Sequence, residues 1–314
     1  RMASLPAALT RRKLARQRKV VLAERQQNYV DAPYGVGGLL LPGLTFPKGH
    51  PYSWPVIGME ADLHAAKVAE LKRFFRRYYS PQNASLVIAG GFEVAPTRAL
   101  VRRYFEWIPA AAPPPKLALP KATAFAPRRL EVNDRVRLPR LTLAWRSPRR
   151  FGVGDAEAEL LATILASGKR SRLHRALLLR RRLAVDVAAY QEGRRLAGQF
   201  VIEVTLRKGA SRPRVARIVM AEVRRLLRYG VEERELRRAK SRLETAFLVR
   251  LQRPRHRADL LNNYLAFAGR ADFLQQDLAR YRRVRRADLL RHGRRLLGRR
   301  PQATLWIVPG AKAS

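Results

Sequence analysis

Cysteine is absent from this chain of 314 residues. Without thiols there is no disulfide framework and no metal site built on thiolate ligands. The apolar runs, such as ASLVIAGG at 84–91, fall far short of the roughly 20 residues that a membrane-spanning helix needs. The sequence therefore predicts no transmembrane helix. The hydrophobic share of 47% is sufficient for about two domains, each with its own core.

Acidic residues are also scarce, with 24 Asp and Glu against 65 Lys and Arg and a net charge of +41. So basic a chain first suggests a nucleic-acid partner. However, the arginines are spread over nearly every predicted helix, and no RRM, zinc-finger or OB-like signature is present. We therefore predict solvated basic helix faces and no specific nucleic-acid partner. A polyanion-binding basic protein, whose binding would weaken with salt, is a remote alternative.

Apolar periodicity and Gly/Pro breaks divide the chain into helices and strands. Strands are predicted at 84–92, 130–136, 140–147, 185–193, 198–209 and 303–310. Helices are predicted at 1–29, 61–79, 94–108, 154–167, 169–182, 212–229, 231–251, 254–270 and about 285–298. The Pro/Ala-rich stretch PAAAPPPKLALP at 109–120 is typical of an extended linker. Strands and helices without strict alternation indicate an α+β fold.

One carboxylate in the first predicted helix has two possible roles. Glu24 lies seven residues after Gln17, so both share one helix face. A carboxylate on a helix is a suitable zinc ligand when two histidines come from elsewhere. A lone Glu among arginines is more often a solvated ion-pair partner, and spacing alone favours that interpretation.

Five sequence segments bear on the role of Glu24. They are VVLAERQQ at 20–27, YVDAPYG at 29–35, FPKGHPYSWPVIG at 46–58, SGKRSRLHRALLLRRRLAVDVAAY at 167–190 and VEERELRRAKSRLETAFL at 231–248. In this order they resemble the insulinase/pitrilysin family of zinc peptidases, over nearly the whole chain. The family carries its third zinc ligand, a glutamate, in a run similar to VVxNERxQ. The resemblance places Glu24 at that metal position and gives Gln17 no catalytic role.

The resemblance implies two sheet-plus-helices domains, with the first truncated at its N-terminus. Residues 1–108 would be the C-terminal part of the metal-binding domain, 109–120 the linker, and 121–314 a second, non-catalytic domain. The family signature H-x-x-E-H, which supplies two histidine ligands and a general base, is not in this chain. Because the chain opens on Arg1, we expect an upstream segment to be missing.

The five histidines do not replace the missing motif. His50 lies in a Gly/Pro-rich loop and is expected to pack or cap that loop, whereas His64 is expected at or near the surface. No pair has metal-ligand spacing, so we expect this chain alone not to bind zinc and assign it no catalytic residue. The other three histidines are flanked by arginines and expected to be solvated: His174, His256 and His292.

Two further expectations concern the second domain and the aromatic residues. Some family members hold substrate with an Arg and a Tyr, and the matching positions here are Leu178 and Val185, so no substrate-binding residue is assigned. The aromatic residues of the 61–79 helix fall at helical spacing and are expected in the core: Phe74, Phe75, Tyr78 and Tyr79.

The function implied by the resemblance is zinc-dependent hydrolysis of unfolded peptides, by a protein longer than this chain. The expected partners are a peptide substrate and, in some relatives, a homologous subunit. The alternative is a non-catalytic partner subunit or scaffold of the same family. A periplasmic or exported location is typical of bacterial relatives and is an analogy only.

Overall fold

The computed structural model describes residues 8–114 and 126–311. Its centre is a five-stranded sheet in the order β1-β5-β2-β4-β3. β1 and β5 pair in parallel, and the other neighbours are antiparallel. The strands are β1 Arg128–Asp134, β2 Arg140–Ser147, β3 Ala184–Gly193, β4 Gly198–Leu206 and β5 Ala303–Pro309.

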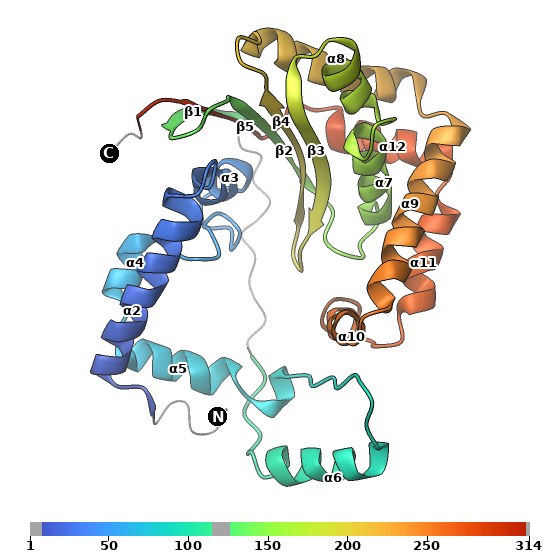
Figure 1. The fold of residues 1–314 in the computed structure, drawn as a ribbon. Helices are drawn as coiled ribbons and strands as arrows, with labels where there is room; N and C mark the ends of the chain where they lie inside the picture. Colours follow the sequence, from blue (N-terminus) through green and yellow to red (C-terminus); the bar gives the residue numbers. More distant parts are fainter. Residues whose placement is uncertain (1–7, 115–125, 312–314) are drawn as a thin grey trace.

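Helices surround this sheet and extend away from it (Figure 1). Those before the sheet are α2 Arg11–Arg25, the π-helix η1 Gln26–Val30, α3 Val36–Thr45, α4 Glu60–Ala65, α5 Val68–Tyr78, the 3-10 turn η2 Pro81–Asn83 and α6 Val94–Phe105. Those after β2 are α7 Asp155–Ala166, the π-helix η3 His174–Arg180, α8 Arg212–Tyr229, α9 Glu233–Leu251, α10 Pro254–Ala268, α11 Leu274–Arg283 and α12 Arg286–Leu297. The α+β prediction is confirmed.

The middle of the sheet is covered on both faces, which explains why residues 141–145 of β2 are all buried. Leu141, Leu143 and Trp145 point into the main core with α7, α8, α9 and α12. Ala144 points to the opposite face, where Leu41 of α3 packs on it. Strands buried on both faces are hydrophobic at successive positions, as β2 is here.

The first part of the chain is tied to the sheet through α3 and the turn before it. The Tyr34 amide donates to Asp134 Oδ2 at 3.1 Å, and its hydroxyl donates to the Leu138 carbonyl at 2.9 Å. A Cβ at Gly37 would lie 3.2 Å from Ile307 Cδ1, so the small residue permits close approach of α3 to β5. Helices α2, α4, α5 and α6 then extend away from the sheet (Figure 1).

The predicted buried strand at 84–92 is wrong. Residues 85–92 form no strand, and Leu86 and Ile88 are 56% and 45% exposed. Every strand in the described ranges belongs to the sheet of residues 128–309, so this apolar segment has no neighbouring backbone with which to form a ladder. Ser85 contacts α10 instead, through a hydrogen bond from Oγ to Asn262 Oδ1 at 2.8 Å.

Two other predictions for this half need correction. The helix predicted at 61–79 is divided into α4 and α5, because Ala66 leaves the helical conformation with ψ 129°. Its aromatic residues are not core residues: Phe74 and Tyr79 are about half exposed, and the group packs on itself, with Phe75 and Tyr79 ring centroids 4.6 Å apart. An aromatic face at helical spacing needs an opposing layer to become a core, and the described residues place none there.

The other sequence predictions mostly hold. The helices at 94–108, 154–167, 212–229, 231–251, 254–270 and 285–298 and the strands after residue 128 are confirmed to within a few residues. The sequence did not predict α11, and the segment predicted as a helix at 169–182 is mainly the π-helix η3. Residues 1–7 and 115–120, part of the predicted first helix and of the linker, lie outside the described ranges.

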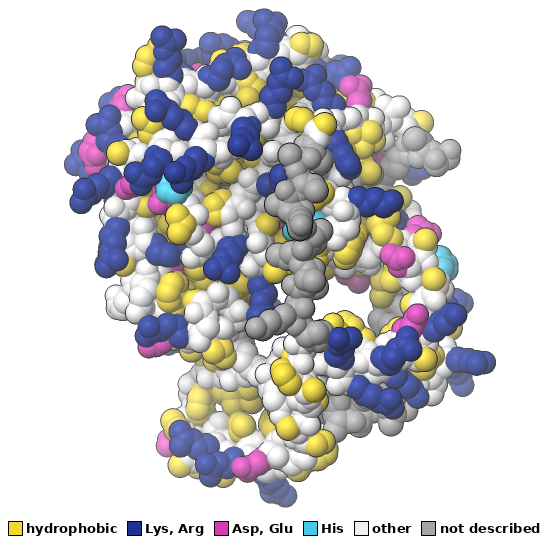
Figure 2. All heavy atoms as spheres, turned by 180° about the vertical axis from the view of Figure 1, so that it is seen from behind, with side chains coloured by type: hydrophobic (Ala, Val, Ile, Leu, Met, Phe, Trp, Pro, Cys, Tyr) yellow, Lys and Arg dark blue, Asp and Glu magenta, His cyan; other side chains and the backbone are white. Residues whose placement is uncertain are grey.

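The surface agrees with the dispersed charge of the sequence. Lys and Arg side chains are distributed over the whole face shown in Figure 2, with a few acidic groups between them. Among the described helices none is both long and apolar enough to cross a bilayer.

Candidate functional site

Helix α2 carries the predicted metal ligand and is fixed to the structure along one face. Thr10 caps its start, its hydroxyl accepting from the Lys13 amide at 3.2 Å. Arg18 then donates to the carbonyls of Leu63 and Ala66 at 2.7 and 2.9 Å, the open carbonyls at the end of α4. Through these bonds Arg18 fixes the rotation of α2 about its own axis.

Because that rotation is fixed, Glu24 lies on the face of α2 that points away from α4. Gln17, Val20, Glu24 and Gln27 recur at three- and four-residue spacing, and all four are exposed. The aliphatic side chain of Val20, one turn before Glu24, is 51% exposed. Within the described ranges the Glu24 carboxylate has no ion pair or hydrogen bond, so the solvated ion pair that spacing alone favoured does not form.

The turn that follows Glu24 is a π-helix. The Asp31 amide donates to the Gln26 carbonyl at 2.7 Å, five residues back, and Gln26 Nε2 donates to Asp31 Oδ1 at 2.8 Å. Single π-turns at the end of α-helices are uncommon and often mark functional sites. This one places an irregular, exposed turn directly beside the Glu24 carboxylate.

Glu24 by itself does not fit a zinc ion. No group of three or more His, Cys, Asp or Glu side chains in the described part of the chain could hold a metal. Zinc in proteins ordinarily takes three or four protein ligands, and one exposed carboxylate is insufficient.

His50 has the structural role expected from the sequence. Its Nδ1 accepts from the Tyr52 amide at 3.0 Å, and its ring stacks on Phe46 with centroids 4.8 Å apart. Burial, and then the positive charge of Arg146, lower its pKa, so the imidazole stays neutral and serves as the acceptor for this turn. His64 is exposed on α4, also as expected.

The prediction of solvated imidazoles at His174, His256 and His292 is wrong. All three are half-buried, and Nδ1 of both His174 and His256 is shielded from water with no hydrogen-bond partner. His292 Nε2 lies 3.6 Å from Glu157 Oε1. Flanking arginines made these positions seem exposed, but the charged groups extend outward while the rings pack inward.

Leu178 and Val185 give no polar contact to a peptide. Leu178 packs against the main core from η3, and Val185 is 46% exposed on β3. Neither side chain can donate or accept a hydrogen bond.

Sequence reasoning missed a polar cluster beneath α11. Asp155 and Asp277 are both buried, and Arg280 lies between them, with contacts of 3.3 Å to Asp155 Oδ2 and 2.5 Å to Asp277 Oδ1. The Tyr264 hydroxyl donates to Asp277 Oδ2 at 2.8 Å. The one local feature that could have indicated this cluster was Gly154-Asp155 at the start of a helix. Arg280 is 125 positions away from Asp155, so no short sequence pattern links the two residues.

A second buried pair adjoins the first. The Tyr281 hydroxyl donates to Glu159 Oε2 at 2.5 Å. Burial raises the pKa of Glu159, and the neighbouring Asp155 raises it further, against the opposing effects of the Tyr281 hydrogen bond and Arg280. Burial also raises the pKa of Tyr281, so its phenol remains a proton donor. Both clusters line one cavity of about 320 Å³.

The model of the peptidase M16 inactive domain matches residues 65–243, more than half of the chain. The chain belongs to this family. The match includes α5, α6, the sheet strands β1 to β4 and most of α9.

Two curated relatives are named as zinc proteases. Zinc protease PqqE of Helicobacter pylori is 22% identical over 300 residues, covering 93% of this chain and 66% of its own length. An uncharacterized zinc protease of Streptomyces coelicolor is 26% identical over 261 residues, covering 80% of this chain and 56% of its own length. The chain thus spans just under two thirds of one relative and little more than half of the other.

Solved structures share the fold. A protease from Helicobacter pylori has a TM-score of 0.84 at 22% identity, with 96% of this chain and 73% of that chain covered. A peptidase M16 inactive domain from Pseudomonas fluorescens has a TM-score of 0.82 at 17% identity, covering 98% and 72% of the two chains. The predicted insulinase-family architecture is confirmed at the level of fold.

Proposed function

We propose that this chain acts as part of a zinc-dependent peptidase that hydrolyses unfolded peptides, with Glu24 as one metal ligand. The observation that carries the proposal is the unpaired Glu24 carboxylate on the outward face of α2, at the position where VVLAERQQ matches the family's ligand run. The names of the two curated relatives support zinc chemistry for the family.

The remaining metal ligands and the general base must come from residues other than those described. The sequence lacks H-x-x-E-H, so this chain alone is expected to be inactive. The open face of α2 supports the same view, because Val20 and Glu24 lie where another helix could pack. We therefore assign no catalytic residue within the chain.

The division of the chain follows from this proposal. Residues 1–108 would complete the metal-binding domain, 109–120 would link, and 121–314 would form the non-catalytic domain. The sheet supports this division, since all its strands lie between residues 128 and 309. The second domain would then form one wall of the space that receives the peptide.

A non-catalytic partner subunit or scaffold of the same family is the second candidate. The aliphatic Leu178 and Val185, and the missing histidine pair, favour it. The carboxylate of Glu24 favours the first candidate, because a subunit without metal has no use for a ligand at that place.

The first test is the coding sequence directly upstream of Arg1. An in-frame H-x-x-E-H some tens of codons earlier is the expected result. A frame that opens at Met2, or a motif lacking either histidine, would favour the partner subunit instead.

The second test is peptide hydrolysis by the protein that the complete frame encodes. We expect cleavage of an unstructured, internally quenched peptide that stops when zinc is chelated. Glu24→Gln should lower kcat/KM by at least about 100-fold, since loss of even an outer-shell partner costs 10–100-fold in metal affinity or activity. Gln17→Ala, on the same helix face, is the matched control and should retain activity. Equal activity of Glu24→Gln and wild type would exclude Glu24 as a ligand.

A further inference from the structure

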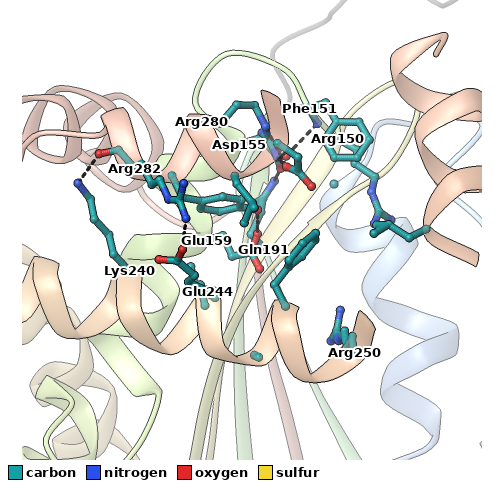
Figure 3. Close-up of a pocket in the computed structure, with 18 of the residues that line it drawn as sticks. Arg150, Phe151, Asp155, Glu159, Gln191, Lys240, Glu244, Arg250, Arg280 and Arg282 are labelled. Carbon is teal, nitrogen blue, oxygen red and sulfur yellow. Dashed lines mark hydrogen bonds and ion pairs between the residues drawn. The ribbon is translucent and has the colours of Figure 1, made fainter. Parts of the chain in front are cut away.

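A cavity in the second half of the chain lies away from Glu24. It is bounded by the loop before α7, the end of β3, and helices α9, α10 and α11 (Figure 3). Its volume of about 320 Å³ is at the lower end of the range for small-molecule sites, about 300–1,000 Å³. A single apolar group with a polar end would fill it.

The carboxylates on its floor are already paired. Asp155 and Asp277 contact Arg280, and Glu159 accepts from the Tyr281 hydroxyl. On the α9 side, Glu244 pairs with Arg282 (Figure 3). The cavity therefore has little free negative charge with which to attract a cation.

Two arginines at the edge of the cavity, in contrast, have no acidic partner among residues 8–114 and 126–311. Arg150 rests over the rings of Phe151 and Phe267, with its guanidinium 5.4 and 5.3 Å from their centroids. Arg250, at the end of α9, makes no side-chain hydrogen bond or ion pair within the described ranges. Figure 3 shows both on the same side of the cavity, opposite Lys240 and Arg282.

An acceptor in the wall also lacks a partner. Gln191 Nε2 donates to the Pro148 carbonyl at 3.0 Å and to Asp155 Oδ1 at 3.2 Å. Both partners are acceptors, so the amide orientation is determined and Oε1 faces away from them. This Oε1 is shielded from water and receives no hydrogen bond. A buried, unpaired acceptor is costly, and a ligand N–H that displaced the groups shielding this oxygen would satisfy it.

Glu192 also lines the cavity, where it pairs with Arg194, and five further lining side chains are apolar. These five side chains form an apolar wall of the cavity: Phe151, Leu243, Phe247, Leu260 and Leu278. Such a wall suits an aliphatic or aromatic side chain, and burying it supplies most of the affinity.

We propose that this cavity binds a carboxylate-bearing apolar ligand of the N-acyl amino acid type, which is also the chemistry of a peptide's C-terminal residue. Arg150 and Arg250 receive the carboxylate, the apolar wall receives the side chain, and Gln191 Oε1 accepts from the amide N–H. The proposal needs no metal and does not depend on the role of Glu24.

The test is to titrate each probe into the full 314-residue chain and to measure binding by calorimetry or NMR. Salt at about 0.15 M screens the general positive charge of the protein. The probes are N-acetylphenylalanine, its C-terminal amide, and a pentapeptide that ends in phenylalanine with a free carboxylate. The acid should bind at least about tenfold more tightly than the amide, as expected for one lost charge-assisted hydrogen bond. Binding of the pentapeptide as well would identify peptide ends as the ligand; binding of the small acid alone would identify free acids.

Variants locate the site. Arg250→Gln should weaken binding of the acid at least about tenfold and leave the affinity for the amide unchanged. It should fold normally, because its side chain has no partner to lose. Arg257→Gln removes the same charge from the neighbouring α10, outside the cavity lining, and should bind as wild type does. Equal affinity for acid and amide, equal effects of the two variants, or no binding at millimolar concentration would overturn the proposal.

Discussion

Arg172 holds Glu235 through two parallel hydrogen bonds, from Nε to Oε1 at 2.9 Å and from Nη2 to Oε2 at 2.6 Å. The same Nη2 donates to the Gly230 carbonyl, at the end of α8, at 2.9 Å. Both side chains are less than 15% exposed. One guanidinium therefore joins the segment before η3 to α9 and to the end of α8.

Glu235→Gln should destabilise the fold. It removes a charge-assisted, largely buried pair and leaves Arg172 without a counter-ion, at an expected cost of about 1–3 kcal/mol in the free energy of unfolding. Urea denaturation at neutral pH measures the change. Glu131→Gln, which breaks the exposed pair with Arg212, is the control and should cost less than about 1 kcal/mol. Equal losses in the two variants would contradict the structural role.

The same pair predicts sensitivity to acid. Burial alone would raise the pKa of Glu235, but the hydrogen bonds from Arg172 and the Glu232 amide, together with the positive charges, hold it below its ordinary value of 4.5. A lowered pKa contributes stability that is present above the ordinary value and lost as pH falls through the folded one. The gap in stability between wild type and Glu235→Gln should therefore narrow as pH falls below about 4.5. A gap that stays constant would contradict the assignment.

Glu159 should have the opposite pH dependence. Its raised pKa, due first to burial, means that the folded state retains its proton to higher pH than the unfolded chain, so stability is lost as pH rises from 4.5 to the folded pKa. Glu159→Gln keeps an acceptor for the Tyr281 hydroxyl and does not titrate. Between about pH 4.5 and about pH 7.5, the free energy of unfolding should fall less in this variant than in wild type. Glu233 is exposed, so Glu233→Gln is the control, and its free energy of unfolding should fall between these two pH values as much as that of wild type.

Gly193 is required for close approach of two backbones. A Cβ there would lie 2.8 Å from Arg150 Cα and 2.9 Å from its nitrogen, both backbone atoms that cannot move independently. Gly193→Ala should cost about 1–3 kcal/mol by thermal or urea unfolding. Gly91→Ala is the control, because no atom lies within 4 Å of its added Cβ. An unchanged free energy of unfolding in Gly193→Ala would show that the backbone at Arg150 and the end of β3 are not in contact.

Residues 85–92 should exchange their amide hydrogens quickly in this chain. They donate no backbone hydrogen bond within the described structure, whereas residues 201–204 of β4 lie between two neighbouring strands. Hydrogen exchange followed by mass spectrometry should show early exchange of the first segment and slow exchange of the second. In a longer protein that supplies partner strands, 85–92 should become protected. Protection in the 314-residue chain itself would contradict the exposed arrangement.

Local sequence patterns predicted most of the second half of the fold. The buried stripe of α8, formed by Val215, Val219, Val223 and Leu226, follows helical periodicity. β2 lies between Pro139 and Pro148, and β4 is an apolar run that begins at Gly198 and is followed by Gly209. Such elements are determined by local pattern and by a core that the same chain provides.

The failures have two physical causes. The segment at 84–92 has the composition of a buried strand, but pairing depends on a neighbouring backbone that local composition cannot reveal. The cavity lining depends on contacts far apart in sequence, such as Arg280 with Asp155. The proposed metal role of Glu24 rests on its surrounding run VVLAERQQ, since its spacing alone favoured an ion pair that the described residues do not form.

The most direct test of the proposed function is the zinc content of the protein encoded by the complete frame. Elemental analysis after dialysis should find about one zinc per chain in wild type and in Glu60→Gln, whose carboxylate pairs with Arg25 near the other face of α2. Glu24→Gln should lose the metal. Zinc retained in Glu24→Gln, or absent from wild type, would contradict the proposal that this helix contributes to a zinc site.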